Sequence, residues 1–216
     1  MKNYNFLQKL LHDFALSGKF INKSLFELDK ILYLDKDNLS LAKKTSHIFI
    51  SGMPRSGTTS VLDYLYSLNE FASLKYSNMP FILSPNLPLV FSKKNLVKKE
   101  RSHGDGLSID LNSPEAFDEF FFNCDLKFIR KELLNYISLI LKSQNKNKYL
   151  SKNNLNYKRI DLINSIFPNA CFLITIREPL QQSFSLLNQH LNFTKLNEKD
   201  KFIERYMRYL GHYEFG

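Results

Sequence analysis

The chain has 216 residues, of which 44% are hydrophobic and 24% are charged, and its formal net charge is +9. This composition predicts one globular domain with a sizeable core, and two cysteines exclude a disulfide scaffold or a cysteine-based metal cluster. The sequence contains no apolar run of about 20 residues, so we expect no membrane span and a cytoplasmic protein. The excess of Lys and Arg suits an anionic ligand.

The first part of the chain is predicted to be helical. Apolar residues recur at helical spacing over residues 5–34, and Gly18 divides this stretch into two parts. We therefore expect a helical hairpin, and we assign residues 1–45 to an N-terminal helical segment packed on the main domain. Residues 46–216 are assigned to that domain.

A strand, a glycine-containing loop and a helix follow in direct succession. The strand is HIFIS at 47–51, the helix covers 57–68, and FASL at 71–74 is a second short strand. Prolines and a Gly-Asp-Gly cluster predict loops and short helices over 78–106.

The second half of the chain alternates helices with strands. Ser113 and Pro114 suit the N-cap and first position of a helix at 114–123, and a second helix is expected at 126–143. The strand KYLSK at 148–152 and a helical segment at 155–167 come next.

The strongest strand signal is ACFLITI at 170–176, in which we expect Cys171 to be buried. A helix then starts at Pro179, and its apolar residues are predicted to face inward: Leu180, Phe184, Leu187 and Leu191. This alternation predicts an α/β fold, a P-loop-like three-layer sandwich with a central, mainly parallel sheet and an N-terminal helical hairpin.

The loop ISGMPRSGTTS at 50–60 has the outline of a phosphate-binding loop, but Thr58 stands where nucleotide-hydrolysing loops carry lysine. Arg55 is its one cation, and the N–H groups of residues 55–59 would converge on an anion at the start of the helix. The strand at 170–176 leads to Arg177 rather than to an aspartate that could hold Mg²⁺. We therefore expect a second anion site at this end of the sheet and no metal.

The two loops together resemble those of the sulfotransferases that use 3′-phosphoadenosine 5′-phosphosulfate (PAPS). PRSGTT at 54–59 is similar to their 5′-phosphosulfate loop, and the stretch 167–185 is similar to their 3′-phosphate motif. YLSKNNLNYKRI at 149–160 resembles the segment that carries a lysine ahead of this motif. The resemblance covers about residues 46–193 and is closer to the bacterial and Golgi type. It implies a PAPS site formed by Arg55, Ser56, Gly57, Thr58, Thr59, Arg177 and Ser185, with Lys152 at the reacting group.

The resemblance implies sulfuryl transfer from PAPS to a hydroxyl or amine of an unidentified acceptor, with a carbohydrate as one option. The product of the donor is adenosine 3′,5′-bisphosphate (PAP). The segment SLKYSNMP, where some members carry a glutamate base, has no carboxylate, so His103 is the predicted base and Asp105 the second choice. Members usually continue beyond the 3′-phosphate motif, and we expect the domain at 46–216 to be incomplete at its carboxyl end.

Two other functions are compatible with parts of the sequence. One is a P-loop nucleotide kinase or NTPase with a divergent loop, against which Thr58 and the strand-end Arg177 both count. The other is a non-catalytic basic protein that binds a polyanion through its lysines. Because no nucleic-acid-binding motif is present, we expect no nucleic-acid partner.

Overall fold

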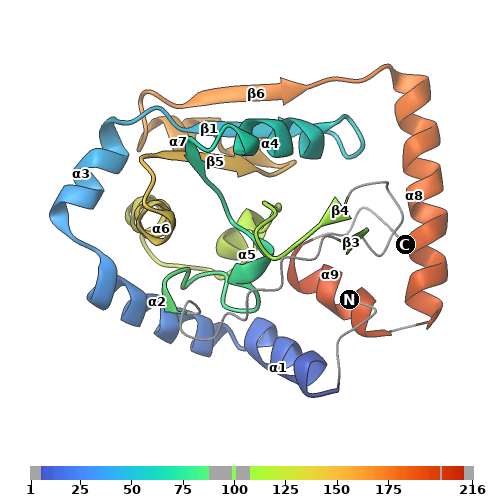
Figure 1. The fold of residues 1–216 in the computed structure, drawn as a ribbon, viewed down its shortest axis with the longest axis horizontal. Helices are drawn as coiled ribbons and strands as arrows, with labels where there is room; N and C mark the ends of the chain where they lie inside the picture. Colours follow the sequence, from blue (N-terminus) through green and yellow to red (C-terminus); the bar gives the residue numbers. More distant parts are fainter. Residues whose placement is uncertain (1–5, 88–98, 101–107, 200, 212–216) are drawn as a thin grey trace.

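The computed structural model describes residues 6–87, 99–100, 108–199 and 201–211 (Figure 1). Its helices are α1 (Phe6–Ser17), α2 (Lys19–Tyr33), α3 (Lys36–Lys44), α4 (Thr58–Ser67), η1 (Tyr76–Asn78), α5 (Asp118–Asn123), α6 (Ile129–Gln144), η3 (Asn156–Arg159), α7 (Ile160–Asn164), α8 (Pro179–Lys199) and α9 (Lys201–Tyr209). Its strands are β1 (Ile48–Gly52), β2 (Phe71–Ala72), β3 (Lys99–Glu100), β4 (Ser108–Ile109), β5 (Lys148–Lys152) and β6 (Cys171–Thr175).

A four-stranded parallel sheet forms the centre of the molecule, in the order β2-β5-β1-β6. The register places Ile50 of β1 opposite Lys152 of β5 and Leu173 of β6. The carboxyl ends of these three strands therefore share one edge of the sheet, which is where ligands bind in parallel α/β folds. The α/β fold with a mainly parallel sheet, predicted from the sequence, is confirmed.

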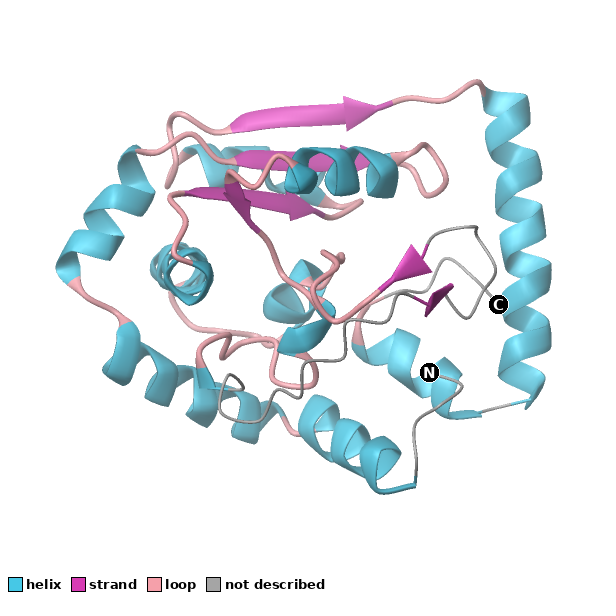
Figure 2. Cartoon of the chain, viewed as in Figure 1, coloured by secondary structure: helices cyan, strands magenta, loops and turns pink. Residues whose placement is uncertain are grey.

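Helices cover both faces of this sheet (Figure 2). Successive residues of a strand point to opposite faces. Ile50 accordingly packs with Leu62 of α4 on one face, whereas Phe49 packs with Phe167 and Tyr149 on the other. The second face belongs to the larger core, which includes α5 and α6, and α2 and α3 pack on α6 from outside. The result is the expected three-layer arrangement.

The predicted N-terminal helices are present as α1 and α2, which meet at Gly18, but they follow one another along one side of the molecule rather than folding back as a hairpin (Figure 1), and the chain then forms a further helix before the sheet. This helix, α3, was not predicted. It starts after Asp35, whose side chain accepts a hydrogen bond of 2.7 Å from the N–H of Asn38. An aspartate in this role is a common N-cap, so the signal was available in the sequence.

The helix expected at 114–123 begins later, as α5 at Asp118. Ser113 is therefore not its N-cap. The Ser113 hydroxyl instead accepts from the N–H of Asp110 over 3.0 Å and donates to the Asp110 carboxylate over 3.1 Å. Such a local turn competes with helix formation, and Pro114 forms a bridge with Lys75. The helix expected at 155–167 is divided into η3 and α7.

Two predictions about burial near β6 are wrong. Cys171 is exposed, because β6 lies at the edge of the sheet rather than at its centre. The apolar residues of α8 expected to face inward are exposed as well, with exposed fractions between 49% and 64%: Leu180, Phe184, Leu187 and Leu191. Helix α8 instead buries Gln182, Gln189 and Phe193. Helical spacing identifies a stripe of similar residues but does not decide which side the rest of the fold covers.

Candidate functional site

The loop between β1 and α4 is held closed by its own residues and by β6. The N–H of Ser56 donates to the Met53 carbonyl oxygen over 3.1 Å, and the Ser56 hydroxyl donates to the same oxygen over 2.7 Å. That hydroxyl has no second proton, so the Thr175 hydroxyl, 2.6 Å away, donates to it. A Cβ on Gly52 would lie 2.3 Å from the Thr175 Oγ1, so this position requires glycine.

At its far end the loop leads into α4. Gly57 precedes the helix with φ of 96°, in the left-handed region that favours glycine. The Val61 N–H donates to the Gly57 carbonyl over 3.1 Å, and the N–H groups ahead of it, including those of Thr58 and Thr59, have no acceptor within the helix. The first turn of α4 thus presents the positive end of a helix dipole, as the sequence predicted for an anion site.

Three side chains from the segment after β6 reach this loop. The Arg55 Nε donates to the Ser185 Oγ over 3.0 Å, and the Arg177 Nη1 donates to the Arg55 carbonyl oxygen over 3.3 Å. The Gln182 side chain donates to the Pro54 carbonyl oxygen over 2.9 Å. The two predicted anion-binding segments therefore meet, and two guanidinium groups near one point create a positive potential that favours an anion.

The amino end of α8 is capped by the chain itself. The Glu178 carboxylate accepts from the N–H groups of Leu180 and Gln181 over 3.0 and 2.7 Å, and these bonds hold its pKa below the usual value. An anion beside α8 would therefore meet the side chains of Arg177 and Ser185 rather than these two amides. The neighbouring Ser183 is engaged elsewhere, because its hydroxyl donates within its own helix, to the Pro179 carbonyl oxygen, over 2.8 Å.

Lys152 ends β5 beside the loop, and only 9% of it is exposed. The segment that follows is fixed by hydrogen bonds. The Asn153 N–H donates to the Ile50 carbonyl oxygen of β1 over 3.1 Å, and its side chain donates to Glu119 over 2.8 Å. Glu119 also forms an ion pair of 2.8 Å with Arg159, and both side chains are largely buried. Lys152 therefore stands on a rigid support.

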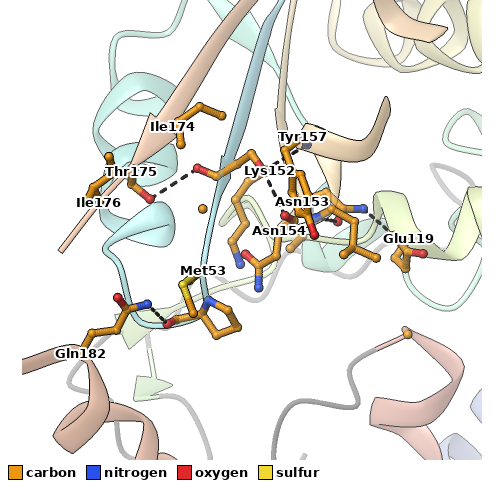
Figure 3. A pocket seen from close by; sticks show the side chains of 16 residues that line it. Met53, Glu119, Lys152, Asn153, Asn154, Tyr157, Ile174, Thr175, Ile176 and Gln182 are labelled. Carbon is orange, nitrogen blue, oxygen red and sulfur yellow. Dashed lines mark hydrogen bonds between the residues drawn. The ribbon is translucent and has the colours of Figure 1, made fainter. Parts of the chain in front are cut away.

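A cavity of about 650 Å³ opens at this edge of the sheet, beside the loop (Figure 3). Residues from the carboxyl ends of β1, β5 and β6 line it, together with residues of α5 and α8 and with Gly211 after α9. The lining consists of Ser51, Gly52, Met53, Pro54, Ala116, Glu119, Lys152, Asn153, Asn154, Leu155, Tyr157, Ile174, Thr175, Ile176, Gln182 and Gly211. A site of this volume is in the range of small-molecule sites.

A model of the sulfotransferase family matches residues 47–215, a range that includes the loop, Lys152 and the segment after β6. The chain belongs to the sulfotransferase family. The resemblance drawn from the two loops is thereby confirmed at the level of the family.

The fold of this family member is similar to that of a solved structure. The crystal structure of the sulfotransferase STF1 from Mycobacterium tuberculosis H37Rv aligns with it at a TM-score of 0.53 and 15% sequence identity. The alignment covers 83% of this chain and 58% of the mycobacterial chain. No curated protein sequence matched this chain. At such an identity, the likeness supports the fold alone.

The predicted catalytic base lies outside the described residues, because His103 and the alternative Asp105 fall within residues 101–107. Among the other histidines, His47 lies at the opposite end of β1 from the loop, where its Nε2 bonds the Ala42 carbonyl and its Nδ1 accepts from a backbone N–H. Burial lowers its pKa to about 4, and the same holds for His12. His190 is exposed on α8.

Two residues that position the loop were not predicted from the sequence. Gln182 and Thr175 hold the loop in place through hydrogen bonds to Pro54 and Ser56. Both lie inside the segment that resembles the 3′-phosphate motif, so the motif marked the right part of the chain but not these residues.

The described residues contain neither a ready-made metal site nor a membrane-spanning helix. No group of three or more His, Cys, Asp or Glu side chains within those ranges is arranged to hold a metal ion. Within the described part of the chain, every helix is too short or too polar to cross a bilayer.

Proposed function

We propose that this protein transfers a sulfuryl group from PAPS to a hydroxyl or amino group of a second substrate. The observation that supports this most directly is the contact of Arg55 with Ser185 and Arg177. The family resemblance assigns Arg55 to the 5′-phosphosulfate and the other two residues to the 3′-phosphate. The two charged ends of one PAPS molecule would then be bound around the point where the loop meets α8.

In this proposal each residue has a chemical role. Arg55 and the N–H groups at the start of α4 hold the 5′-phosphate and stabilise the negative charge on the bridging oxygen as it leaves. Lys152, at the end of β5, stabilises charge on the sulfuryl group. The acceptor oxygen forms a bond to sulfur while the bond from sulfur to the bridging oxygen breaks, and the acceptor proton passes to a base. His103 is the first candidate for that base, and Asp105 is the second.

Calorimetry with PAP and adenosine 5′-monophosphate tests the donor site. The two ligands differ only by the 3′-phosphate, so their affinities isolate the role of Arg177 and Ser185. One charge-assisted contact and one hydroxyl contact predict that PAP binds more tightly by roughly 2–4 kcal/mol, or about 30- to 1,000-fold. We expect this difference to persist in EDTA.

Variants identify the residues responsible. Arg177→Ala should reduce the preference for PAP, whereas Arg208→Ala, which removes an exposed arginine from α9, should leave it unchanged. Equal affinities of the wild-type protein for the two nucleotides would contradict the proposal. Binding that requires Mg²⁺ and ATP would favour a kinase, and salt-sensitive binding of polyanions that tolerates Arg55→Ala would favour a polyanion-binding protein.

A further inference from the structure

The cavity beside the loop differs in character from the positively charged contact of Arg55, Arg177 and Ser185. None of these three residues lines it. Its larger apolar and aromatic side chains come from the loop, from the start of η3 and from the end of β6 with the residue after it: Met53, Pro54, Leu155, Tyr157, Ile174 and Ile176. Figure 3 shows Lys152, Asn153 and Asn154 at the centre of the lining, with Ile174–Ile176 on one side and Glu119 on the other.

Several polar side chains of the lining already bond other groups of the protein. Asn153 donates to Glu119, Glu119 is paired with Arg159, and Gln182 donates to the Pro54 carbonyl. A sugar ring brings several hydroxyl groups, each of which needs a partner when it leaves water. A sugar would have to compete for donors and acceptors that already bond other protein groups, which lowers its affinity. An apolar ligand needs no such partners.

The apolar side chains have the opposite requirement. Ile176 is 89% exposed and Ile174 is 52% exposed, so their apolar surface meets water in the free protein. Met53 and Tyr157 are also more than half exposed. A ligand with an apolar body would remove this surface from water, which is the main source of affinity in small-molecule sites.

The cavity also borders the groups that the proposed reaction uses. Met53 and Pro54 line it and directly precede Arg55 in the loop, and Lys152 belongs to its lining. A ligand in the cavity can therefore present one polar atom toward Lys152 and the loop while the rest of it lies against the apolar walls. That orientation is the one an acceptor requires for attack on the sulfuryl group.

From this geometry we infer that the cavity is the acceptor site and that the acceptor is an alcohol or phenol on an apolar body, rather than a carbohydrate. The inference rests on the proposed function. The acceptor O–H would form the new oxygen–sulfur bond as the bond from sulfur to the bridging oxygen of PAPS breaks. The proton would pass to the base, and the products would be an apolar sulfate ester and PAP.

The chemical class of the acceptor is tested by comparing the turnover of two acceptors by the full chain. With PAPS as donor, 2-naphthol should be sulfated with a kcat/KM at least about 30-fold above that of methyl β-glucopyranoside, because a hydrophobic pocket discriminates by roughly 10- to 200-fold for a single methylene group. Preference for the glucoside would overturn the inference. Binding of 2-naphthol should also be independent of PAP, and competition between them would show that the cavity belongs to the adenine.

Matched variants locate the site. Ile174→Thr keeps a β-branched residue in the strand and should lower the kcat/KM for 2-naphthol about tenfold with unchanged PAP affinity. Leu187→Thr is the control, because Leu187 is 53% exposed but does not line the cavity. Equal losses in both variants would overturn the inference.

The two proposals fail in different ways. PAP binding without a preference for 2-naphthol would reject only the apolar acceptor. Failure of PAP to bind would reject the proposed function. In that case direct binding of 2-naphthol, weakened by Ile174→Thr and unaffected by Leu187→Thr, would still support an apolar ligand in this cavity, and absence of such binding would reject it.

Discussion

Replacing Asp118 by asparagine should change how the stability of the protein depends on pH. Asp118 is 7% exposed and accepts hydrogen bonds from the hydroxyls of Tyr149 and Ser151 on β5, the latter over 2.6 Å. Burial outweighs these bonds and raises the pKa of its carboxyl group from 3.8 to about 6. The neutral form is therefore favoured in the folded protein, and ionisation has an energetic cost that asparagine avoids.

The sign and size of the effect follow from the two pKa values. Between the unfolded value of 3.8 and the folded value of about 6, the native state binds more protons than the unfolded state, so the free energy of unfolding falls as the pH rises. The shift corresponds to about 3 kcal/mol in full, of which about 2.5 kcal/mol is lost between pH 4 and pH 7. Above the folded pKa the contribution is gone.

Urea unfolding of the wild type and of Asp118→Asn at a series of pH values measures this change in the free energy of unfolding. The stability of the wild type minus that of Asp118→Asn should fall by about 2.5 kcal/mol from pH 4 to pH 7. The difference between the two proteins removes the contributions of other groups that titrate in both. These groups are Asp29, whose pKa is also raised to about 6, and His12 and His47, whose pKa values are lowered. Asp161→Asn, at an exposed position of α7, controls for the lost charge. A flat or rising difference would refute the reasoning.

Two further substitutions test how the loop is held. Gln182→Leu removes the bond to the Pro54 carbonyl and should weaken PAP binding by about 1–2 kcal/mol in calorimetry, while Gln181→Leu, at the exposed neighbouring position, should not; equal effects would contradict a positioning role. Gly52→Ala forces a Cβ to within 2.3 Å of the Thr175 Oγ1 and 2.9 Å of its carbonyl oxygen, and should cost about 1–3 kcal/mol of stability in urea unfolding. An unchanged midpoint would show that the close approach is absent in solution.

The sequence was sufficient for the parts of the fold that depend on local signals. β1, β5 and β6 appear where short apolar runs predicted them, and the glycine-containing loop joins β1 to α4 as expected. The orientation of α8 could not be predicted, because it depends on which neighbours exist on each side. Its polar Gln182 finds an acceptor at Pro54, and this contact between distant segments leaves the apolar stripe of α8 exposed.

The same limit applies to the site. Arg55 and Arg177 could be singled out from short sequence patterns alone. A cation in a phosphate-type loop and a cation at the end of a strand each indicate an anion site. Their meeting at Ser185 depends on the strand order, which places β6 beside β1. The cavity depends on still more distant segments, since residues after β5 and β6 form its walls together with parts of α5 and the chain near Gly211.

The backbone of Arg55 offers a way to separate function from stability. Its φ is 69°, in the left-handed region, where a residue with a Cβ pays about 1–2 kcal/mol that glycine does not. Arg55→Ala and Arg55→Gly both lose the bond to Ser185, so both should bind PAP more weakly by about 1.5–3 kcal/mol. Arg55→Gly should nevertheless be the more stable of the two, by up to about 1 kcal/mol after the greater freedom of glycine in the unfolded chain is counted.

Calorimetry and urea unfolding of the two variants measure these quantities separately. If Arg55→Ala proves the more stable, the loop does not hold this conformation in the free protein. If either variant binds PAP as tightly as the wild type, the guanidinium is not a ligand of the nucleotide. A strained backbone at a position that glycine would fit better persists when the side chain is needed there, and in this loop the guanidinium is the group that glycine cannot supply.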